Sequence, residues 1–424
     1  MKIFYASGER PNQALPGSQV WRNNLYLALV DLGHEVVEFD YDLNPLLRHA
    51  DMERPDHRAF VEANRPLAEA ALLEQTTAAH QQGPIDLFFS YFYSVCAQPS
   101  TIRQIGEMGI RTMNWYCNGS YQFDLVEEIA PAYDWSLVPE AFRLDDYRRV
   151  GANPIYCQEA ANPLVYHPMP VARDLDVVFV GARYGERPAY IRRLVDAGIS
   201  VRAFGPGWQR AVQQVPVKAP AEGAERRKGV GWRARALQLL TTDGWRRLAR
   251  KVGRQFRLLP PAARRGSAAV RPATQQRPRG DDVALPPEVC GPPLSDNEMV
   301  EMYSRARISL GFSAVGNMPK DAERILQVRL RDFEAPMSGA FYLVEQMEEL
   351  ESFFRIGREI VTYTDPADLV EKCAYYLAHD EERERIRAAG HARALRDHTW
   401  QRRFTDVFRT AGLQSPSQPD IKAR

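Results

Sequence analysis

The segment "SQVWRNNLYLALVDLGHEVVEFD", residues 18–40, decides the fold class because it joins a helix pattern directly to a strand pattern. Its apolar residues recur at the spacing of one helix face, Ser18 is suited to cap the helix, and Gly33 is suited to end it. The apolar run "KIFYAS" (residues 2–7) precedes this helix, and "HEVVEFD" follows it. A strand, a helix and another strand in this order form a βαβ unit, which predicts a parallel sheet.

Apolar runs continue to alternate with helical segments through the first half of the chain, and the same pattern begins again near residue 175. Further strands are expected to begin near Ile85, Arg111, Asp134 and Pro154. "LDVVFVG", from residue 175, repeats the opening pattern, and "ISVRAFG", "RISLGFS", "GAFYLVE" and "EIVTYTD" are later strands. A chain of 424 residues also exceeds the size of one core. We predict an α/β protein with two Rossmann-like, doubly wound domains, residues 1–168 and 169–385, which face a cleft.

The second domain carries clear helix signals, and the chain continues beyond it. Ser295 and Glu298 form a capping-box pattern, and Asp365 followed by Pro366 predicts another helix start. Residues 386–412 favour a long helix that crosses back to the first domain, and the polar tail 413–424 is expected to be disordered.

Composition narrows the class of protein. The net charge is +1, which gives no global affinity for polyanions, and no run of about 18 apolar residues predicts a membrane span. The start "MKIFYASGE" lacks the basic and apolar regions of a signal peptide. The five cysteines are far apart and form no CxxC pair, which argues against a disulfide framework or a structural zinc site. We expect a cytoplasmic protein.

An insertion within the second domain, residues 209–286, is strongly basic although the whole chain has a net charge of only +1. Residues 209–280 hold 18 Lys and Arg against three acidic residues, a net charge of +15. Much of the segment has a composition typical of disorder, but Trp245–Leu259 has the pattern of a basic amphipathic helix. Such a helix lies on an anionic membrane, here the inner face, or packs on the protein's own surface with its basic face in water. We keep both interpretations; nucleic acid is a weaker third because no aromatic residues interleave the charges.

Three stretches of the second half carry a family resemblance. They are "RDFEAPMSGAFYLVE" (331–345), "GREIVTYTDPADLVEKCAYYL" (357–377) and "ERIRAAGHARALRDHTWQRRF" (384–404). They resemble the carboxyl-terminal domain of the CgeB-like glycosyltransferases, which belong with the retaining, metal-independent enzymes of GT-B fold. The resemblance extends from Tyr303 to Phe408, and the first half matches only in layout. It implies a hexosyltransferase-like enzyme that moves a sugar from an NDP-sugar to an acceptor, without a metal or other cofactor. It also implies that the first domain, residues 1–168, binds the acceptor and that the second, residues 169–385, binds the nucleotide sugar.

The resemblance also implies a donor site. Enzymes of this kind carry a Glu followed five residues later by a Gly, and Glu334 and Gly339 match that spacing. The Glu accepts hydrogen bonds from the ribose hydroxyls, a role that suits a carboxylate. The nearby cations Arg331, Arg329 and Lys320 would then neutralise the departing diphosphate.

The predicted donor site has a non-functional alternative explanation, and it departs from the family pattern at one position. The alternative is that Arg331 and Glu334 form a solvated surface pair. Many relatives also carry an earlier Glu at the position of Leu326, so the contacts to the donor sugar stay open. Pro336 restricts Glu334 to the start of a helix.

Other candidates rest on weaker patterns. Gly17, Gly181 and Gly205 follow predicted strands and could let the backbone approach a diphosphate, although ordinary turns need glycine equally. Asn118 and Asp124 follow a strand of the first domain and could hold acceptor or donor hydroxyls. No histidine pair has metal-ligand spacing.

Two other functions stay open at this level. A nucleotide-sugar epimerase shares this architecture, but it needs carboxylates at the sugar ring, and the sequence offers no convincing set. A non-catalytic binding or tethering protein could use the basic insertion to reach a membrane or a partner. The acceptor, which could be a glycan, a lipid-linked sugar or a protein, is not predicted.

Overall fold

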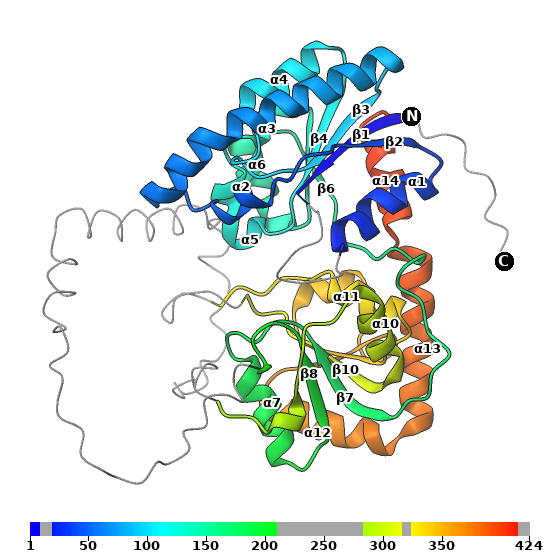
Figure 1. Ribbon diagram of the computed structural model, residues 1–424. Coiled ribbons are helices and arrows are strands. Elements are labelled where there is room, and N and C mark those ends of the chain that lie inside the picture. The colour runs from blue at the N-terminus through cyan, green and yellow to red at the C-terminus, as the bar shows by residue number, and fades with distance from the viewer. Residues whose placement is uncertain (9–18, 210–282, 316–323, 414–424) are drawn as a thin grey trace, which may run out of the picture. The chain divides into compact units, whose positions relative to one another are not determined.

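The computed structural model describes residues 1–8, 19–209, 283–315 and 324–413. All of them belong to one compact unit that contains two parallel sheets (Figure 1). Several predicted features lie outside the described residues: Ser18, Gly17, Lys320, the helix Trp245–Leu259 with nearly all of the basic insertion, and the tail after residue 413. They stay predictions.

The first sheet has six parallel strands in the order β2-β1-β3-β4-β5-β6. They are β1 (Lys2–Ser7), β2 (Glu35–Glu38), β3 (Leu87–Tyr91), β4 (Arg111–Trp115), β5 (Trp135–Val138) and β6 (Pro154–Tyr156). Every residue of the central strand β3 is buried, as expected for a parallel strand covered on both faces, whereas the edge strand β2 is half exposed.

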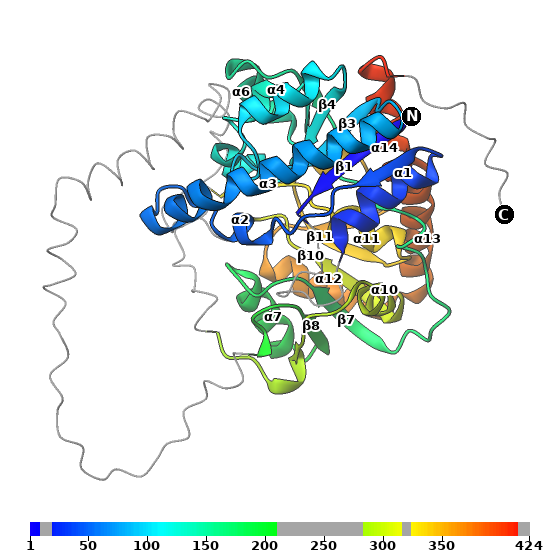
Figure 2. The same cartoon turned by 45° about the horizontal axis from the view of Figure 1, so that its top comes forward.

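Helices cover both faces of this sheet. They are a π-helical turn η1 (Arg22–Tyr26) continued by α1 (Leu27–Asp31), then α2 (Asn44–Arg48), α3 (Pro55–Gln82), α4 (Pro99–Glu107), α5 (Gly119–Gln122) and α6 (Leu144–Arg149). Gly33 follows α1 with φ 79°, a left-handed conformation that favours glycine, as the sequence predicted. Figures 1 and 2 show α3 and α4 on one face of the sheet and α1 on the other.

The second sheet repeats the design with the order β12-β11-β10-β7-β8-β9, again all parallel. Its strands are β7 (Leu175–Val180), β8 (Val201–Phe204), β9 (Cys290–Gly291), β10 (Ala306–Gly311), β11 (Tyr342–Glu345) and β12 (Val361–Tyr363). Its helices are α7 (Arg187–Asp196), α10 (Asp296–Arg305), α11 (Arg331–Met337) and α12 (Pro366–Ala378). The capping box of Ser295 and the cap formed by Asp365 are both present. The predicted fold class, two Rossmann-like domains, is confirmed; the domain boundaries themselves stay predictions.

The end of the chain differs from the single helix expected over residues 386–412. It forms α13 (Asp380–Asp397), which packs against α11 and α12, and α14 (Trp400–Thr410), which packs against α1 of the first domain (Figure 2). The helix is interrupted because the backbone at His398 and Trp400 bonds to Ala161 instead of continuing the helical pattern. The Thr399 hydroxyl then caps the new helix by accepting from the amide of Arg402.

Gly390 lets α13 approach the second sheet closely. A Cβ on Gly390 would lie 2.1 Å from the carbonyl oxygen of Glu359, whereas a Cβ on Gly106 of α4 would meet no atom within 4 Å. We expect Gly390→Ala to lower the free energy of unfolding by about 1–3 kcal/mol, because backbone has to move. Gly106→Ala should leave it unchanged or raise it by up to about 1 kcal/mol. Denaturant unfolding of both variants measures this, and equal effects would contradict close packing at Gly390.

Candidate functional site

The candidate site lies where the carboxyl-terminal edges of the two sheets meet, which is where ligands bind in parallel α/β sheets. Direct hydrogen bonds join the domains there. The Ser120 hydroxyl lies 2.5 Å from Oε1 of Gln327, and Nε2 of Gln327 donates to the carbonyl of Cys117 at 3.0 Å. Ser120 and Cys117 follow β4 of the first domain, whereas Gln327 precedes α11 of the second.

Glu334 is at the centre of this contact. It lies in the first turn of α11, as Pro336 predicted, and its side chain has no exposed surface. Its Oε2 pairs with Nη1 of Arg331, and its Oε1 accepts a long hydrogen bond, 3.4 Å, from Nδ2 of Asn24. The pair is therefore not a solvated surface pair, because the side chain of Glu334 is fully buried and only that of Arg331, 34% exposed, reaches water.

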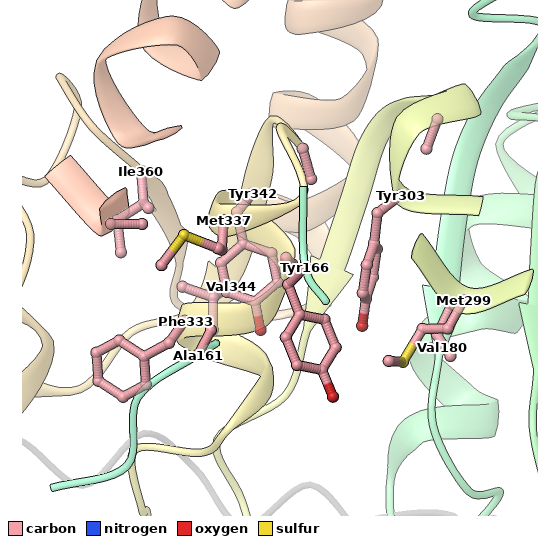
Figure 3. Packing of buried hydrophobic residues seen from close by; sticks show 14 of the residues in the cluster. Ala161, Tyr166, Val180, Met299, Tyr303, Phe333, Met337, Tyr342, Val344 and Ile360 are labelled. Carbon is pink, nitrogen blue, oxygen red and sulfur yellow. The ribbon is translucent and has the colours of Figure 1, made fainter. Parts of the chain in front are cut away.

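Two residues that do not belong to the helices of the second domain, Asn24 and Tyr166, form hydrogen bonds with Glu334. Nδ2 of Asn24 also lies 3.3 Å from the Tyr166 hydroxyl, and Oδ1 of Asn24 accepts from the amide of Asn162. Tyr166 and Tyr303 both belong to the buried cluster that Figure 3 shows. The sequence reasoning missed Asn24 because its position on a helix face gives no sign of a contact with a residue 310 positions away.

Two cations of the second domain lack ion-pair partners among the described residues. Arg329 and Arg187 lie near each other, and neither forms an ion pair with any described carboxylate. Arg187 is buried, stacks over Tyr184 with 3.8 Å from its guanidinium carbon to the ring centroid, and donates to the carbonyl of Ala182. Burial, together with Arg329, lowers the pKa of Arg187 to about 10. The buried Nε atoms of Arg187 and Arg329 find no acceptor within the described part of the chain.

Arg324 shows the opposite arrangement. It bridges Glu186 and the buried Glu345, and the same Glu345 accepts from the amides of Ser313 and Ala314. The charge of Arg324 is therefore matched inside the protein. This contrast singles out Arg187 and Arg329 as cations that are suited to an external anion. The sequence predicted Arg329 but missed Arg187, which stands among several arginines of a helical pattern and is distinguished only by its burial.

The predicted glycines fall into two groups. Gly181 and Gly205 end β7 and β8 side by side, and a Cβ on Gly205 would lie 2.4 Å from the carbonyl oxygen of Gly181. Gly339 follows α11 with φ 74° beside Pro168, and its carbonyl accepts from Arg173 and Arg387. These contacts give each glycine a packing role, and their contribution to a ligand site stays a prediction.

The first-domain candidates are close in sequence but differ in exposure. Asn118 is half-buried at the start of α5, and Asp124 is exposed. More deeply placed carboxyls follow the next strands: Glu140 after β5 and Glu159 after β6, both buried. Burial raises the pKa of Glu140 to about 8, and it raises the pKa of Glu159 well above its ordinary value, an effect that the neighbouring Glu140 increases. The sequence reasoning found no such carboxyl set.

Asp332 adds a third buried carboxyl, on the second domain. It accepts from the amide of Arg329 and from the hydroxyl of Tyr342, and burial raises its pKa to about 6. Its bonds fix the start of α11 and hence the backbone of Arg329. Within the described ranges, no three His, Cys, Asp or Glu side chains are arranged to hold a metal ion, and no helix is long and apolar enough to cross a membrane.

Comparisons with known proteins bear on the fold and on the class of activity. A family described as glycosyl transferase-like matches residues 246–409. A search of curated proteins found no match. Among solved structures, the chain is similar to sucrose-phosphate synthase (tll1590) from Thermosynechococcus elongatus, with 13% identity, a TM-score of 0.51, and coverage of 96% of this chain and 98% of that one. It is also similar to Anabaena Alr3699/HepE in complex with UDP and glucose, with 10% identity, a TM-score of 0.50, and coverage of 97% and 99%.

The structural likenesses, at such low identity, show the fold alone, which is GT-B. The family match covers residues 246–409, less than half of the chain, and supports a glycosyltransferase activity.

Proposed function

We propose that the enzyme transfers a sugar from a nucleoside-diphosphate sugar to a hydroxyl acceptor, with retention of configuration, as the resemblance to CgeB-like enzymes implies. One observation carries the proposal. Arg187 and Arg329 are close enough for the charge of Arg329 to lower the pKa of Arg187, neither forms an ion pair with a described carboxylate, and each has a buried Nε that has no acceptor among the described residues. One buried and one half-buried cation that lack an ion-pair partner among the described residues are suited to an anion, and a diphosphate supplies two charged groups. The solved structure of HepE with UDP and glucose supports a donor of this kind for this fold.

Glu334 is proposed to bind the ribose. A carboxylate has about four lone-pair sites, and in this structure Glu334 uses them for Arg331, for the hydroxyl of Tyr166 and, weakly, for Asn24. A ribose diol would replace the 3.4 Å contact to Asn24 with two hydroxyl donors. Because Glu334 is fully buried, the donor would enter by parting Asn24 from it.

Leaving-group stabilisation is assigned to cations. As the glycosidic bond breaks, negative charge grows on the diphosphate, and fixed guanidinium groups in a buried site stabilise it strongly. Arg329 and Arg331 from the predicted set, with Arg187 added, would supply this charge, and Lys320 keeps the role that the resemblance implies. No side chain is assigned as a base, because in retaining enzymes of this class the departing phosphate is thought to accept the acceptor's proton. Independence of a metal stays a prediction.

The ribose contact can be tested with nucleotides alone. UDP, GDP, ADP and TDP are screened by thermal shift, and a ligand at a hundredfold excess over Kd should stabilise the folded protein by about 2.7 kcal/mol. Glu334→Ala and Glu334→Gln should weaken binding of the best nucleotide about tenfold to a hundredfold, because each removes hydrogen bonds to a charged acceptor. Glu301→Gln, on the partly exposed carboxylate of α10, is the matched control. Unchanged affinity in both Glu334 variants would refute the assignment.

The proposed contact of Arg187 with phosphate is tested by comparing a nucleoside diphosphate with the corresponding nucleoside. Arg187→Gln should weaken binding of the nucleoside diphosphate at least tenfold and leave the corresponding nucleoside unaffected, because only the phosphates meet the guanidinium group. Arg192→Gln, five residues along the same helix and exposed, should change neither affinity. Calorimetric titration of all three proteins measures both ligands. If nucleoside and nucleoside diphosphate lose affinity equally, Arg187 supports the fold and does not contact phosphate.

A further inference from the structure

Asp332, in the first turn of α11, is a buried carboxyl group that forms no ion pair with any described cation. It is 1% exposed. Its two oxygens accept hydrogen bonds from neutral groups, Oδ2 from the backbone amide of Arg329 at 2.8 Å and Oδ1 from the hydroxyl of Tyr342 at 2.7 Å. Because removing a carboxylate from water without a cation is costly, its presence here calls for an explanation.

The hydroxyl of Tyr342 reaches Asp332 across a glycine of the neighbouring strand. Tyr342 is on β11, 1% exposed, within the buried cluster of Figure 3. β11 pairs with β10, and a Cβ on Gly311 of β10 would lie 2.2 Å from the Tyr342 hydroxyl oxygen. The hydroxyl therefore occupies the place that a side chain at position 311 would fill. The sheet thus holds a hydrogen-bond donor at a fixed place beside the start of α11.

Arg329 is held both at its backbone and at the tip of its side chain. Asp332 accepts from its amide, and its own carbonyl accepts from the amide of Asp332 at 2.8 Å. At the other end, Nη2 of Arg329 donates to the carbonyl of Ala314 at 2.8 Å. Between these ends, Nε is buried and has no acceptor in the part of the chain that the structure describes. A guanidinium group fixed in this way loses little freedom when it binds an anion.

The bonds of Asp332 leave the charge of Arg329 available. Burial raises the pKa of Asp332 to about 6, and its hydrogen bonds together with the nearby charge of Arg329 limit the rise. The carboxylate nevertheless bonds the amide of Arg329 and not its guanidinium group. A direct ion pair, such as the one between Arg331 and Glu334, would fix the side chain but would also neutralise it.

We propose that Asp332 and Tyr342 are positioning residues, which hold Arg329 in place to contact the diphosphate of the donor, and that this role requires the ionised form of Asp332. The inference rests on the proposed function and deepens it, because donor binding becomes dependent on pH through a residue that does not touch the donor. An ionised carboxylate accepts from both donors at once. A neutral carboxyl carries a proton on one oxygen and leaves one of the two donors without an acceptor.

The direction of the pH effect follows from these bonds. With a pKa of about 6, Asp332 is ionised above that pH and neutral below it. The affinity for the donor should therefore fall as the pH is lowered from 8 to 5, with a midpoint near pH 6. An effect of charge alone would have the opposite sign, because an ionised carboxylate repels a diphosphate and its protonation would strengthen binding.

Other charged and titratable groups face Asp332, and the test must keep them unchanged. They are Arg329 of the preceding turn, Tyr342 of β11, Tyr303 of α10, Glu159 after β6 and Glu349 of the 3-10 turn Glu348–Ser352. Asp332→Asn alters none of these residues. The difference between this variant and the wild type at each pH therefore reports on the carboxyl group itself.

The first measurement is calorimetric titration of the full chain with UDP-, GDP-, ADP- and TDP-glucose, followed by pH profiles with the ligand that binds best. Their phosphates stay ionised from pH 5 to pH 8, whereas the terminal phosphate of a free nucleoside diphosphate titrates near pH 6. Asp332→Asn offers one acceptor oxygen to two donors, so it should weaken binding about fivefold to fiftyfold at pH 8 and remove the fall toward pH 5. The corresponding nucleoside, which has no phosphate, should keep its affinity.

Tyr342→Phe gives a second, independent signature. It keeps the ring in the core and removes one hydrogen bond to the ionised form of Asp332. Because that bond lowers the pKa of Asp332, the midpoint of the pH profile should move upward in this variant. A defect of packing alone would weaken binding at every pH without moving the midpoint.

Matched controls come from the first domain. The buried carboxyl of Glu69 holds the start of α4 by accepting from the amide of Gln98 and the hydroxyl of Thr101, much as Asp332 holds α11. The buried hydroxyl of Tyr133 bonds to that of Ser90. Glu69→Gln and Tyr133→Phe should therefore leave both the affinity and its pH profile unchanged.

The outcomes separate this inference from the proposed function. If none of the four nucleotide sugars binds the wild type, the proposed function fails and the inference fails with it. If one binds and Arg187→Gln weakens it, but Asp332→Asn binds it equally well or more tightly, only the positioning role is refuted. Equal losses for nucleoside and nucleotide sugar would show that Asp332 supports α11 as a whole, and would also overturn the role. Should Asp332→Asn not fold, a wild-type profile that is flat from pH 5 to pH 8, or an unmoved midpoint in Tyr342→Phe, would refute it.

Discussion

A fully buried carboxylate, Glu334, constrains the arrangement of the two domains. A charge without exposed surface is tolerated only when it is paired and hydrogen-bonded, because removing it from water costs several kcal/mol. Arg331 supplies the charge from the same helix, and Asn24 supplies a hydrogen bond from the other domain. The cover over Glu334 is thus made of polar contacts that a polar ligand can replace. If apolar side chains covered Glu334, a polar ligand would have no hydrogen bonds to replace.

The surrounding structure keeps α11, and therefore Glu334, in place. Asp332 ties the start of the helix to Tyr342 of β11, and Gly339 ends it against Pro168. The helix α13 packs along α11, and the chain then turns at Thr399 so that α14 packs on the first domain. The same C-terminal segment therefore supports the donor-side helix and contacts the opposite domain. The position of Glu334 is therefore linked to the first domain in two ways: through its bond to Asn24, and through α13 and α14.

The sequence predicted the fold and part of the site for reasons that differ in kind. Strands such as β3 and β7 appear as short apolar runs because parallel strands are buried on both faces, so a one-dimensional pattern carries the information. Glu334 was predicted as a site residue through a family spacing, and its role stays a prediction. Glu140 and Glu159 were missed because only the pairing of β5 with β6 brings them together, and Arg187 was missed because burial alone separates it from the exposed arginines of its helix. The break between α13 and α14 depends on a long-range backbone pairing with Ala161, which no local pattern reveals.

The distribution of charge across the site suits the proposed reaction. The second domain supplies cations without ion-pair partners among the described residues, Arg187 and Arg329, whereas the first domain supplies carboxyls that burial keeps neutral. In a sugar transfer the departing diphosphate gains negative charge while the attacking hydroxyl starts neutral. A carboxylate held ionised beside the acceptor would repel the diphosphate across the cleft and oppose its stabilisation by the guanidinium groups. A neutral carboxyl avoids that repulsion and still orients a hydroxyl group.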